Sequence, residues 1–218
     1  MLPLSSPIRF GSLEVRPPWA SPGQKIGLLG GSFNPAHEGH LNASLIALRR
    51  LGLDRVWWIV SPGNPLKTAS RVADFEARVA SAKALARDPR IIVTPFEAAL
   101  PTAYTAAMLA FLQVRYPGTR FVWLMGADNL AGFHRWMDWR GILETVPIAI
   151  VDRPNCRMRA VASRAAGAFR SSHVPEAEAR TLAGLRPPAW CFLTGPLSTE
   201  SSTAIRARRI AKQARETV

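Results

Sequence analysis

Short apolar runs alternate with longer amphipathic segments along this chain from Lys25 onward. Apolar runs rich in Val, Ile and aromatic residues are typical of buried strands, and apolar residues that recur every three or four positions are typical of helices. Strands are therefore expected at Lys25–Leu29, Arg55–Val60, Ile91–Thr94, Arg120–Met125, Pro147–Val151 and Trp190–Thr194. Strands that alternate with helices in this way predict an α/β fold, built of βα units around a mainly parallel sheet.

The first helix is predicted from leucine spacing. Leu41, Leu45 and Leu48 recur at helical intervals, and Gly52 follows as a stop signal. This segment is expected to be an amphipathic crossover helix between the first two strands. Further helices are expected at Ala73–Asp88, at Tyr104–Arg115 and, as a basic helix, at Ser201–Arg215.

The length of 218 residues, 48% of them apolar, is enough to bury the core of one domain. Residues 1–24 are rich in proline with scattered arginines, and we expect a loosely ordered N-terminal extension there. Residues 25–218 are expected to form a single domain. Within it, residues 156–188 are rich in Ala, Arg and Ser, with helical character near Val161–Phe169 and no clear strand, which indicates a peripheral insertion.

The apolar runs are far shorter than the roughly 20 residues that a membrane-spanning helix needs. The first 24 residues also lack the continuous apolar stretch of a secretory signal. The two cysteines, Cys156 and Cys191, lie far apart and outside any metal-ligand spacing. We therefore expect a reduced protein in the cytoplasm.

The formal net charge is +13, from 28 basic and 15 acidic residues. Most of the basic residues are arginines, whose planar guanidinium suits bidentate contacts to phosphate. A polyanionic ligand agrees with this charge, but so does a solvated basic surface. The sequence has no run of aromatic residues interleaved with basic ones, which counts against a stacking platform for nucleic acid.

The stretch Gly30–His40, with the sequence GGSFNPAHEGH, joins the first strand to the first helix. Ligands of open α/β sheets bind at this carboxyl edge. Gly30 and Gly31 lack Cβ atoms, so a nucleotide could approach their backbone, and the helix start is expected to offer free N–H groups to phosphate. These features predict an anion site.

His37 and His40 are three residues apart, a spacing that at a helix start places both rings on one face. Two imidazoles there could donate hydrogen bonds to phosphate oxygens and stabilise the charge on a departing pyrophosphate. The alternative is structural: one histidine caps the helix and the other packs in the loop. Together with two glycines at a strand end, the pair favours the phosphate site.

This stretch resembles the GGxFxPxHxGH signature of the nucleotidyltransferase superfamily, whose HxGH motif is similar to that of class I aminoacyl-tRNA synthetases. The resemblance implies a Rossmann-like, doubly wound, mainly parallel sheet with helices on both faces. It also implies that ATP is bound by residues of the first motif: Gly30, Gly31, Ser32, Phe33, His37 and His40.

Ser201–Arg206 resembles the SSTxIR segment that closes over the ATP phosphates in this superfamily. The resemblance implies that Ser202, Thr203 and Arg206 bind ATP. The alternative is a capped basic helix with its arginine in solvent. Glu200 departs from the family pattern, in which an apolar residue usually precedes this segment.

Gly126–Leu130, followed by Phe133–Trp136 and Trp139, resembles the GxDxL…FxxW…W region of bacterial nicotinate-nucleotide adenylyltransferases. The resemblance implies that Trp136 stacks on the pyridine ring of the acceptor. It also implies that Gly126 and Asp128 belong to the ATP site, with Asp128 at the adenosine end or near a metal. Core packing is the alternative for the two tryptophans, and we expect it for Trp139.

Ala103–Thr105 resembles the SYTxxTL segment in which this family recognises the nicotinate carboxylate, which implies that Tyr104 and Thr105 bind substrate. Ala103 and Met108 replace the usual Ser and second Thr. Without the resemblance, Tyr104 and Thr105 would be a helix cap and a partly buried aromatic residue.

The loop at Pro62–Lys67 is similar to the family's PxxxPxxK segment, which implies that Lys67 neutralises phosphate, although an isolated lysine in such a loop is more often solvent-exposed. Downstream, Phe75, Arg78 and Val79 resemble an FxxRxxM helix. Asp152–Pro154 resembles the family's RPG triplet.

The resemblance implies adenylyl transfer from ATP to nicotinate mononucleotide in NAD biosynthesis, with His37, His40, Lys67 and Arg206 as the catalytic residues. Mg²⁺ would be carried by the ATP phosphates, with no protein metal site. Nicotinamide mononucleotide and phosphopantetheine stay open as acceptors, and so does a homo-oligomer. A rival of another class is a basic RNA-binding protein that kept the scaffold and lost the chemistry.

Overall fold

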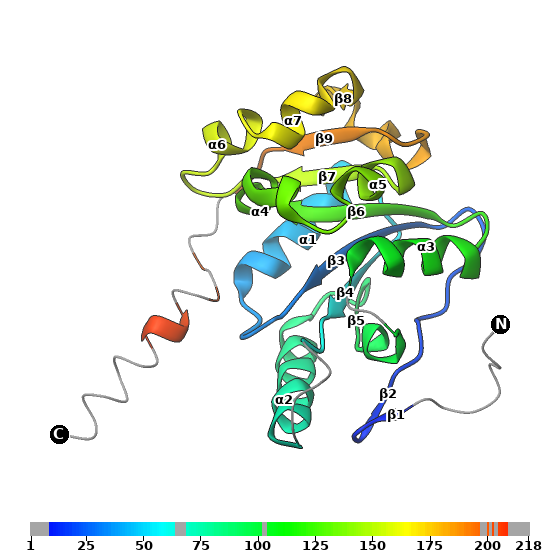
Figure 1. Cartoon of the computed structure of the whole chain (residues 1–218), viewed down its shortest axis with the longest axis vertical. Helices are drawn as coiled ribbons and strands as arrows, with labels where there is room; N and C mark the ends of the chain where they lie inside the picture. Colours follow the sequence, from blue (N-terminus) through cyan, green and yellow to red (C-terminus); the bar gives the residue numbers. More distant parts are fainter. Residues whose placement is uncertain are drawn as a thin grey trace.

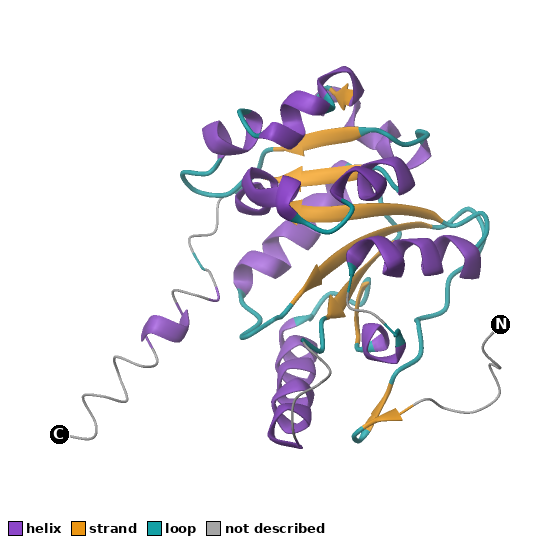
Figure 2. Ribbon diagram, in the orientation of Figure 1, coloured by secondary structure: helices purple, strands orange, loops and turns teal. Residues whose placement is uncertain are grey.

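A seven-stranded parallel sheet lies at the centre of the protein (Figures 1 and 2). The computed structural model describes residues 9–63, 69–101, 104–196, 200, 202 and 205–208, with the side chains of residues 69–73 left out. The strands of the sheet are β3 (Lys25–Gly31), β4 (Arg55–Val60), β5 (Ile91–Thr94), β6 (Arg120–Gly126), β7 (Ile148–Val151), β8 (His173–Val174) and β9 (Trp190–Leu193). Their order is β5-β4-β3-β6-β7-β9-β8, and every neighbouring pair is parallel.

Helices cover both faces of this sheet, which confirms the predicted α/β fold. The α-helices are α1 (Glu38–Arg50), α2 (Ala69–Leu85), α3 (Thr105–Arg115), α4 (Ala127–Gly132), α5 (Trp139–Thr145), α6 (Arg157–Val161) and α7 (Arg164–Ala168). Short 3-10 helices are η1 (Phe96–Ala99), η2 (Phe133–Arg135), η3 (Arg170–Ser172) and η4 (Glu176–Gly184). Of the helix predicted at Ser201–Arg215, the described residues 202 and 205–208 are helical.

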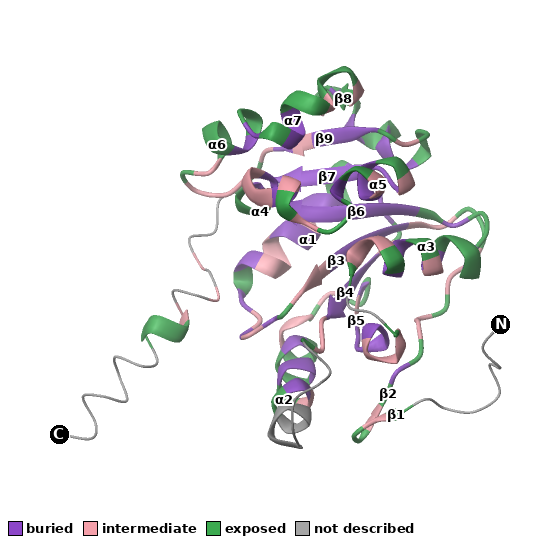
Figure 3. Ribbon diagram, viewed as in Figure 1, coloured by how far each residue is buried: buried purple, intermediate pink, exposed green. Residues whose placement is uncertain are grey.

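Two hydrophobic cores lie on opposite faces of the sheet, because successive side chains of a strand point to opposite sides. In β4 the adjacent residues Trp57 and Trp58 are both fully buried, and each belongs to a different core. One core packs against α1, α2 and η4. The other packs against α3, α4, α5, α6 and α7. Figure 3 shows the resulting buried strands between half-exposed helices.

The segment predicted to be a peripheral insertion contains α6, α7, β8 and η4. The expectation of no clear strand was wrong at one point, because His173–Val174 forms the edge strand β8 and pairs with Trp190 and Cys191. A two-residue strand is too short to show an alternating pattern in the sequence. The edge of the sheet is therefore supplied by a segment without a strand signal.

Residues 9–24 run along the domain and form the hairpin β1 (Arg9–Phe10) and β2 (Leu13–Glu14). Val15 is buried, and the hydroxyl of Tyr116 donates to the carbonyl of Pro18 at 2.8 Å. The hydroxyl of Thr119 donates to the carbonyl of Ser21 at 3.1 Å. These contacts attach the described part of the N-terminal segment to the face of the sheet that carries α3, which we call the second core (the core that packs against α3, α4, α5, α6 and α7).

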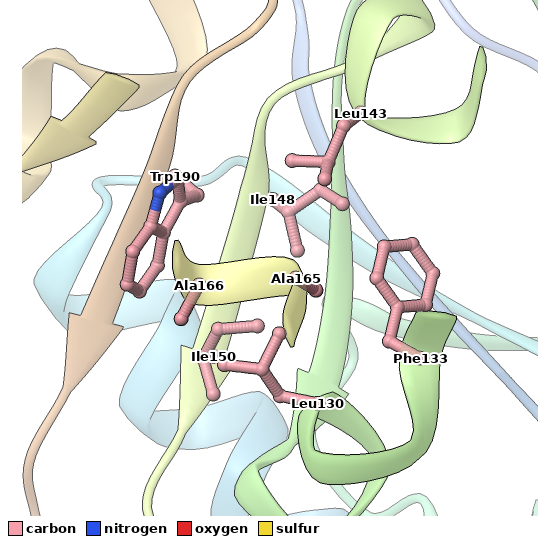
Figure 4. Close-up of a pocket in the computed structure, with 8 residues that line it drawn as sticks. All are labelled: Leu130, Phe133, Leu143, Ile148, Ile150, Ala165, Ala166 and Trp190. Carbon is pink, nitrogen blue, oxygen red and sulfur yellow. The ribbon is translucent and has the colours of Figure 1, made fainter. Parts of the chain in front are cut away.

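A small pocket lies between β7, β9 and α7 (Figure 4). It is lined by Leu130, Phe133, Leu143, Ile148, Ile150, Ala165, Ala166 and Trp190. Its cavity volume is about 10 Å³, no more than a single water molecule needs, and its lining is apolar. We interpret it as a packing gap of the second core, so the functional site must lie elsewhere.

The strand order reverses between β3 and β6, the two central strands. In doubly wound sheets the crevice at such a point, beyond the carboxyl ends of the strands, binds ligands. Figure 1 shows that the strand arrows point toward the side on which the C-terminal helical segment lies. Within the described residues, no helix is long and apolar enough to cross a membrane.

Candidate functional site

The loop between β3 and α1 is held by aromatic packing. Phe33 has a φ of 46° and is 1% exposed, and its ring stacks on Trp58 at a centroid distance of 5.2 Å. The same ring lies 4.6 Å from that of His40. A bulky residue adopts positive φ only where its surroundings hold it there. The aromatic contacts therefore give the loop one defined shape next to the sheet edge.

Arg78 of α2 fixes the beginning of this loop. Its Nη1 donates to the backbone carbonyl of Ser32 at 2.5 Å and to that of Ser61 at 2.8 Å. Its Nε donates to Asp74 at 3.2 Å, and the residue as a whole is 9% exposed. Arg78 thus ties together the ends of β3 and β4. The sequence marked Arg78 as part of a helix motif but did not indicate this positioning role.

The two histidines of the loop cap the start of α1, and their rings lie close together. His37 is the N-cap residue, and its Nδ1 accepts from the N–H of Gly39 at 3.1 Å. The Nδ1 of His40 accepts from the N–H of His37 at 3.3 Å, and the ring centroids lie 3.9 Å apart. Because each Nδ1 accepts, the proton of each neutral ring is on Nε2. The same pair of histidines can therefore cap the helix and still have an N–H group for a phosphate.

The surroundings of the pair keep both rings uncharged. Burial lowers the pKa of His40 to about 3, helped by the proximity of His37 and of the positive charge of Arg153. Burial also lowers the pKa of His37, with a further contribution from Arg153, against the opposing effect of Glu200 and Asp128. At neutral pH the rings are hydrogen-bond donors rather than cations. Neutral imidazoles can donate to phosphate oxygens, which is the role that the sequence predicts for them.

Gly30, Gly39 and Gly126 are close-packed against protein side chains. A Cβ on Gly30 would clash with Cη2 of Trp123, because the indole lies where a side chain at position 30 would begin. A Cβ on Gly39 would lie 2.9 Å from the ring of His37, and one on Gly126 would clash with Oδ1 of Asp128. Packing against Trp123 therefore gives a structural reason for glycine at position 30, and the approach of a nucleotide to this backbone stays a prediction.

The first N–H groups of α1 were expected to be free, but in the structure they already have partners. The N–H of Glu38 donates to Oε2 of Glu200 at 3.1 Å, and the N–H of His40 donates to the carbonyl of His37 at 2.9 Å. The N–H groups of His37 and Gly39 are taken by the two imidazoles. Protein groups thus already satisfy the first amides of the helix, and a phosphate would have to displace one of them.

The C-terminal motif lies against the same loop. The hydroxyl of Ser202 donates to the carbonyl of Pro35 at 3.0 Å, and Nη1 of Arg206 donates to the carbonyl of Asn34 at 2.6 Å. The two motifs, 167 positions apart at Pro35 and Ser202, are therefore neighbours in space. Lys67 and Thr203, which were predicted to belong to the site, lie outside the described residues.

Arg153, which was not among the expected site residues, lies at the centre of this group. It follows β7, and its Nη1 donates to the carbonyl of Glu200 at 3.0 Å. Its Nε lies 3.8 Å from Oδ1 of Asp128, whose side chain is 52% exposed. The triplet Asp152–Pro154 was the available signal, but spacing along the chain does not show that β7 ends beside β6.

A separate hollow of about 250 Å³ opens at the start of α3 and is lined by Tyr104, Thr105, Trp136 and Met137. Trp136 meets the ring of Phe133 edge-on, at a centroid distance of 5.3 Å. Three of these four residues were assigned to acceptor binding from the sequence, and Met137, which is 60% exposed, was not. The structure therefore brings the acceptor motifs together around one open space.

Trp139 belongs to the second core, as expected from the sequence. It is 8% exposed, and its ring packs edge-on against Phe133 and Phe169. The two tryptophans of the region thus differ: Trp136 lines the hollow and Trp139 supports the helices behind it.

Candidate metal ligands are sparse in the described part of the chain, where no group of three or more His, Cys, Asp or Glu side chains could hold a metal ion. Asp128 offers a partly exposed carboxylate beside Arg153 at the end of β6. Such a setting does not form a protein cage. It suits a cation that brings most of its ligands with a phosphate substrate.

Known proteins match both the sequence and the fold. Residues 28–208 match the family described as cytidylyltransferase-like. A protein of Methylorubrum extorquens, named "Probable nicotinate-nucleotide adenylyltransferase", is 56% identical over 184 residues, covering 84% of this chain and 100% of that protein. One with the same name from Cereibacter sphaeroides is 56% identical over 182 residues, covering 84% and 96%.

Among solved structures, the nicotinic acid mononucleotide adenylyltransferase of Plasmodium falciparum complexed with NaAD has a TM-score of 0.57. It covers 84% of this chain and 83% of its own at 15% identity, which supports the fold. The motifs at the carboxyl edge, the match over residues 28–208 and the 56% identity lead to one conclusion. The chain belongs to the nicotinate-nucleotide adenylyltransferases, a family of nucleotidyltransferases with the cytidylyltransferase-like fold.

Proposed function

We propose that this protein transfers the adenylyl group of ATP to nicotinate mononucleotide, giving nicotinate adenine dinucleotide and pyrophosphate. The main support for this proposal is the arrangement of residues at the carboxyl edge of the sheet. There a neutral histidine pair, with its ring protons on Nε2, lies in the loop that follows β3, while a hollow lined by Tyr104, Thr105 and Trp136 opens at the start of α3. Two phosphate-bearing substrates need two such neighbouring regions.

On the ATP side, a phosphate oxygen of the acceptor attacks the α-phosphorus in line, and pyrophosphate leaves. The attacking group is already an anion, so catalysis reduces to positioning and to stabilising charge. His37 and His40 donate from Nε2 to phosphate oxygens, and Arg206 and Lys67 add positive charge. Arg153, beside the pair, is a further cation within this group.

The other ATP contacts follow the assigned motifs. The backbone of Gly30, Gly31, Ser32 and Phe33 borders the phosphates, and Ser202 and Thr203 donate hydroxyl hydrogen bonds to them. Gly126 and Asp128, at the end of β6, line the ATP site at its adenosine end. These roles are proposals that the ligand-bound protein would test.

On the acceptor side, Trp136 stacks on the pyridine ring, and the start of α3 at Tyr104 and Thr105 receives the carboxylate. The N-terminus of α3 is the positive end of an 11-residue helix. A carboxylate is favoured at such a position over a neutral amide. This favours nicotinate mononucleotide over nicotinamide mononucleotide.

Mg²⁺ is the proposed metal, bound mainly through the phosphates of ATP. Mg²⁺ prefers oxygen ligands and often binds through one or two carboxylates together with substrate phosphates. Asp128 is the described carboxylate best placed to join such a set, and when bound the ion would neutralise charge on the phosphates. The protein residues still have to orient the two substrates.

The reaction can be tested by mixing the protein with ATP, Mg²⁺ and, in parallel, nicotinate mononucleotide, nicotinamide mononucleotide or phosphopantetheine, and by following pyrophosphate release. We expect release chiefly with nicotinate mononucleotide. Equal or greater release with either other acceptor would replace the proposed substrate. Release with none, together with salt-sensitive retention of RNA, would support the RNA-binding alternative; the oligomeric state and the cytoplasmic location stay predictions.

A further inference from the structure

The carboxylate of Glu200 lies at the positive end of a helix that the proposed function assigns to ATP. Its Oε2 accepts from the N–H of Glu38, the first residue of the 13-residue helix α1, at 3.1 Å. Anionic oxygens at such positions are stabilised by the helix dipole and by the free amides, as phosphate oxygens are. Glu200 therefore occupies an anion position inside the proposed phosphate site.

The position of Glu200 is defined by contacts on both sides. Its backbone carbonyl accepts from Nη1 of Arg153 at 3.0 Å. Two residues later, Ser202 donates to the carbonyl of Pro35 at 3.0 Å, so the segment is held against the loop before α1. The negative charge also acts on the proposed catalytic pair, since it raises the pKa of His37 against the effect of burial.

A nucleoside triphosphate that binds at the histidine pair comes close to the negative charge of Glu200. Arg153 and the start of α1 are the same donors that a phosphate would use, and the N–H groups of His37, Gly39 and His40 already have partners within the protein. The N–H of Glu38 is the one of these first amides whose partner is an ionised side chain from another segment. A phosphate oxygen could take its place without breaking the capping of the helix.

We propose that the Glu200 carboxylate stands in for a phosphate oxygen at the start of α1 in the ligand-free protein, and that ATP and pyrophosphate bind by displacing it. This inference rests on the proposed function, because it assumes that polyphosphate binds at the histidine pair. Glu200 is then a positioning residue that weakens the binding of both polyphosphates and favours the departure of pyrophosphate after each turnover.

The test is binding of Mg²⁺-ATP and of pyrophosphate, each measured by calorimetry, to the full-length protein and to its Glu200→Gln and Glu200→Ala variants. Glutamine keeps an acceptor for the Glu38 N–H but removes the charge, so the fold should be retained. We expect the dissociation constants of both ligands to fall by roughly three- to ten-fold in Glu200→Gln, the range of a single charge effect at a helix start. Glu200→Ala should tighten binding at least as much.

The matched control is Glu144→Gln, which removes an exposed carboxylate near the end of α5, just before β7 begins at the opposite edge of the sheet. We expect it to change either dissociation constant by less than about two-fold, because the interaction between distant exposed charges is largely screened by salt. In steady-state assays, the Michaelis constant for ATP should fall in Glu200→Gln while that for nicotinate mononucleotide stays the same.

Unchanged or weaker polyphosphate binding in Glu200→Gln would overturn the inference and leave the proposed function standing. Equal tightening in Glu144→Gln would overturn it as well, because the effect would then be one of general charge. Absence of ATP binding in the wild-type protein would instead refute the proposed function, and this inference with it.

Discussion

Nδ1 of His40 accepts a hydrogen bond from the backbone N–H of His37 at 3.3 Å, and Nδ1 of His37 in turn accepts from the N–H of Gly39 at 3.1 Å. Capping the helix therefore uses one nitrogen of each ring and leaves the other nitrogen, with its proton, for a ligand. The structural interpretation of this motif therefore does not exclude the proposed catalytic one, because capping uses only one nitrogen of each ring.

Replacing His40 with alanine is expected to reduce kcat for adenylyl transfer about 10²- to 10³-fold, because it removes a preorganised donor to the transition state. The loss of one capping contact should lower the free energy of unfolding by about 1 kcal/mol. Steady-state kinetics and chemical denaturation measure the two effects. His173→Ala, which removes an exposed ring on β8, serves as the control; a His40→Ala enzyme with near-wild-type kcat would disprove the role.

The low pKa of His40, about 3, predicts that its ring stays neutral throughout the working pH range. Because the folded value lies below the ordinary 6.5, stability associated with this group is present above pH 6.5 and is lost as the pH falls toward 3. Imidazole ¹⁵N chemical shifts recorded between about pH 4 and 8 should show no protonation of His40, while free imidazole added to the same sample should titrate. A midpoint for His40 close to the ordinary value would contradict the described burial.

Trp136→Ala is expected to raise the Michaelis constant for nicotinate mononucleotide by about ten-fold, because stacking on an aromatic ring contributes on the order of 1 kcal/mol or more. The constant for ATP should change little. Trp139→Ala provides the contrast, since this buried ring should cost about 3–5 kcal/mol of stability. A Trp136→Ala variant that affected both substrates alike would show that the ring supports the fold instead.

Gly30→Ala is expected to destabilise the protein, because the new Cβ would clash with Cη2 of Trp123. Overpacking of this kind costs about 1–3 kcal/mol. Trp123→Phe removes the clashing atom, so in the double variant the Gly30→Ala penalty should shrink. A double-mutant cycle by denaturation measures the coupling. Additive effects would show that Trp123 is not the neighbour that requires glycine at position 30.

Glu97 is expected to make stability fall as the pH rises. Burial raises its pKa from 4.5 to about 7, against a hydrogen bond with Ser61 that lowers it. The folded protein therefore holds the proton more tightly than the unfolded chain, and this stabilisation is full below pH 4.5 and lost as the pH rises through 7. Relative to wild type, Glu97→Gln should gain roughly 2–3 kcal/mol of unfolding free energy between about pH 4.5 and 8.

Chemical denaturation of both proteins across this pH range measures the difference in their unfolding free energies. The effect of the histidines is the same in both proteins and cancels in this difference. Glu178→Gln, at an exposed glutamate of η4, is the control and should show no such trend. A constant difference between Glu97→Gln and wild type would mean that the Glu97 carboxyl group does not change its protonation on folding in this range.

The sequence by itself determined six strands of the sheet, the helices α1, α2 and α3 between them, and the identity of the main motifs. Apolar periodicity located β4 at Arg55–Val60 and β5 at Ile91–Thr94 with the same bounds as the structure. Local patterns succeed there because a strand buried on both faces needs a continuous apolar run. The GGSFNPAHEGH motif also carried its chemistry in the sequence, since two histidines at a helix start face one way whatever the rest of the fold does.

Only the tertiary structure decided which groups meet these motifs. Glu200 reaches the N–H of Glu38 across 162 positions, and Arg78 reaches the carbonyl of Ser32 across 46. The position of Arg153 depends on β7 lying beside β6, an order set by the packing of the whole sheet. Hydrogen bonds and charges between distant segments depend on the folded path of the chain, and residue spacing in one sequence does not encode that path in a readable form.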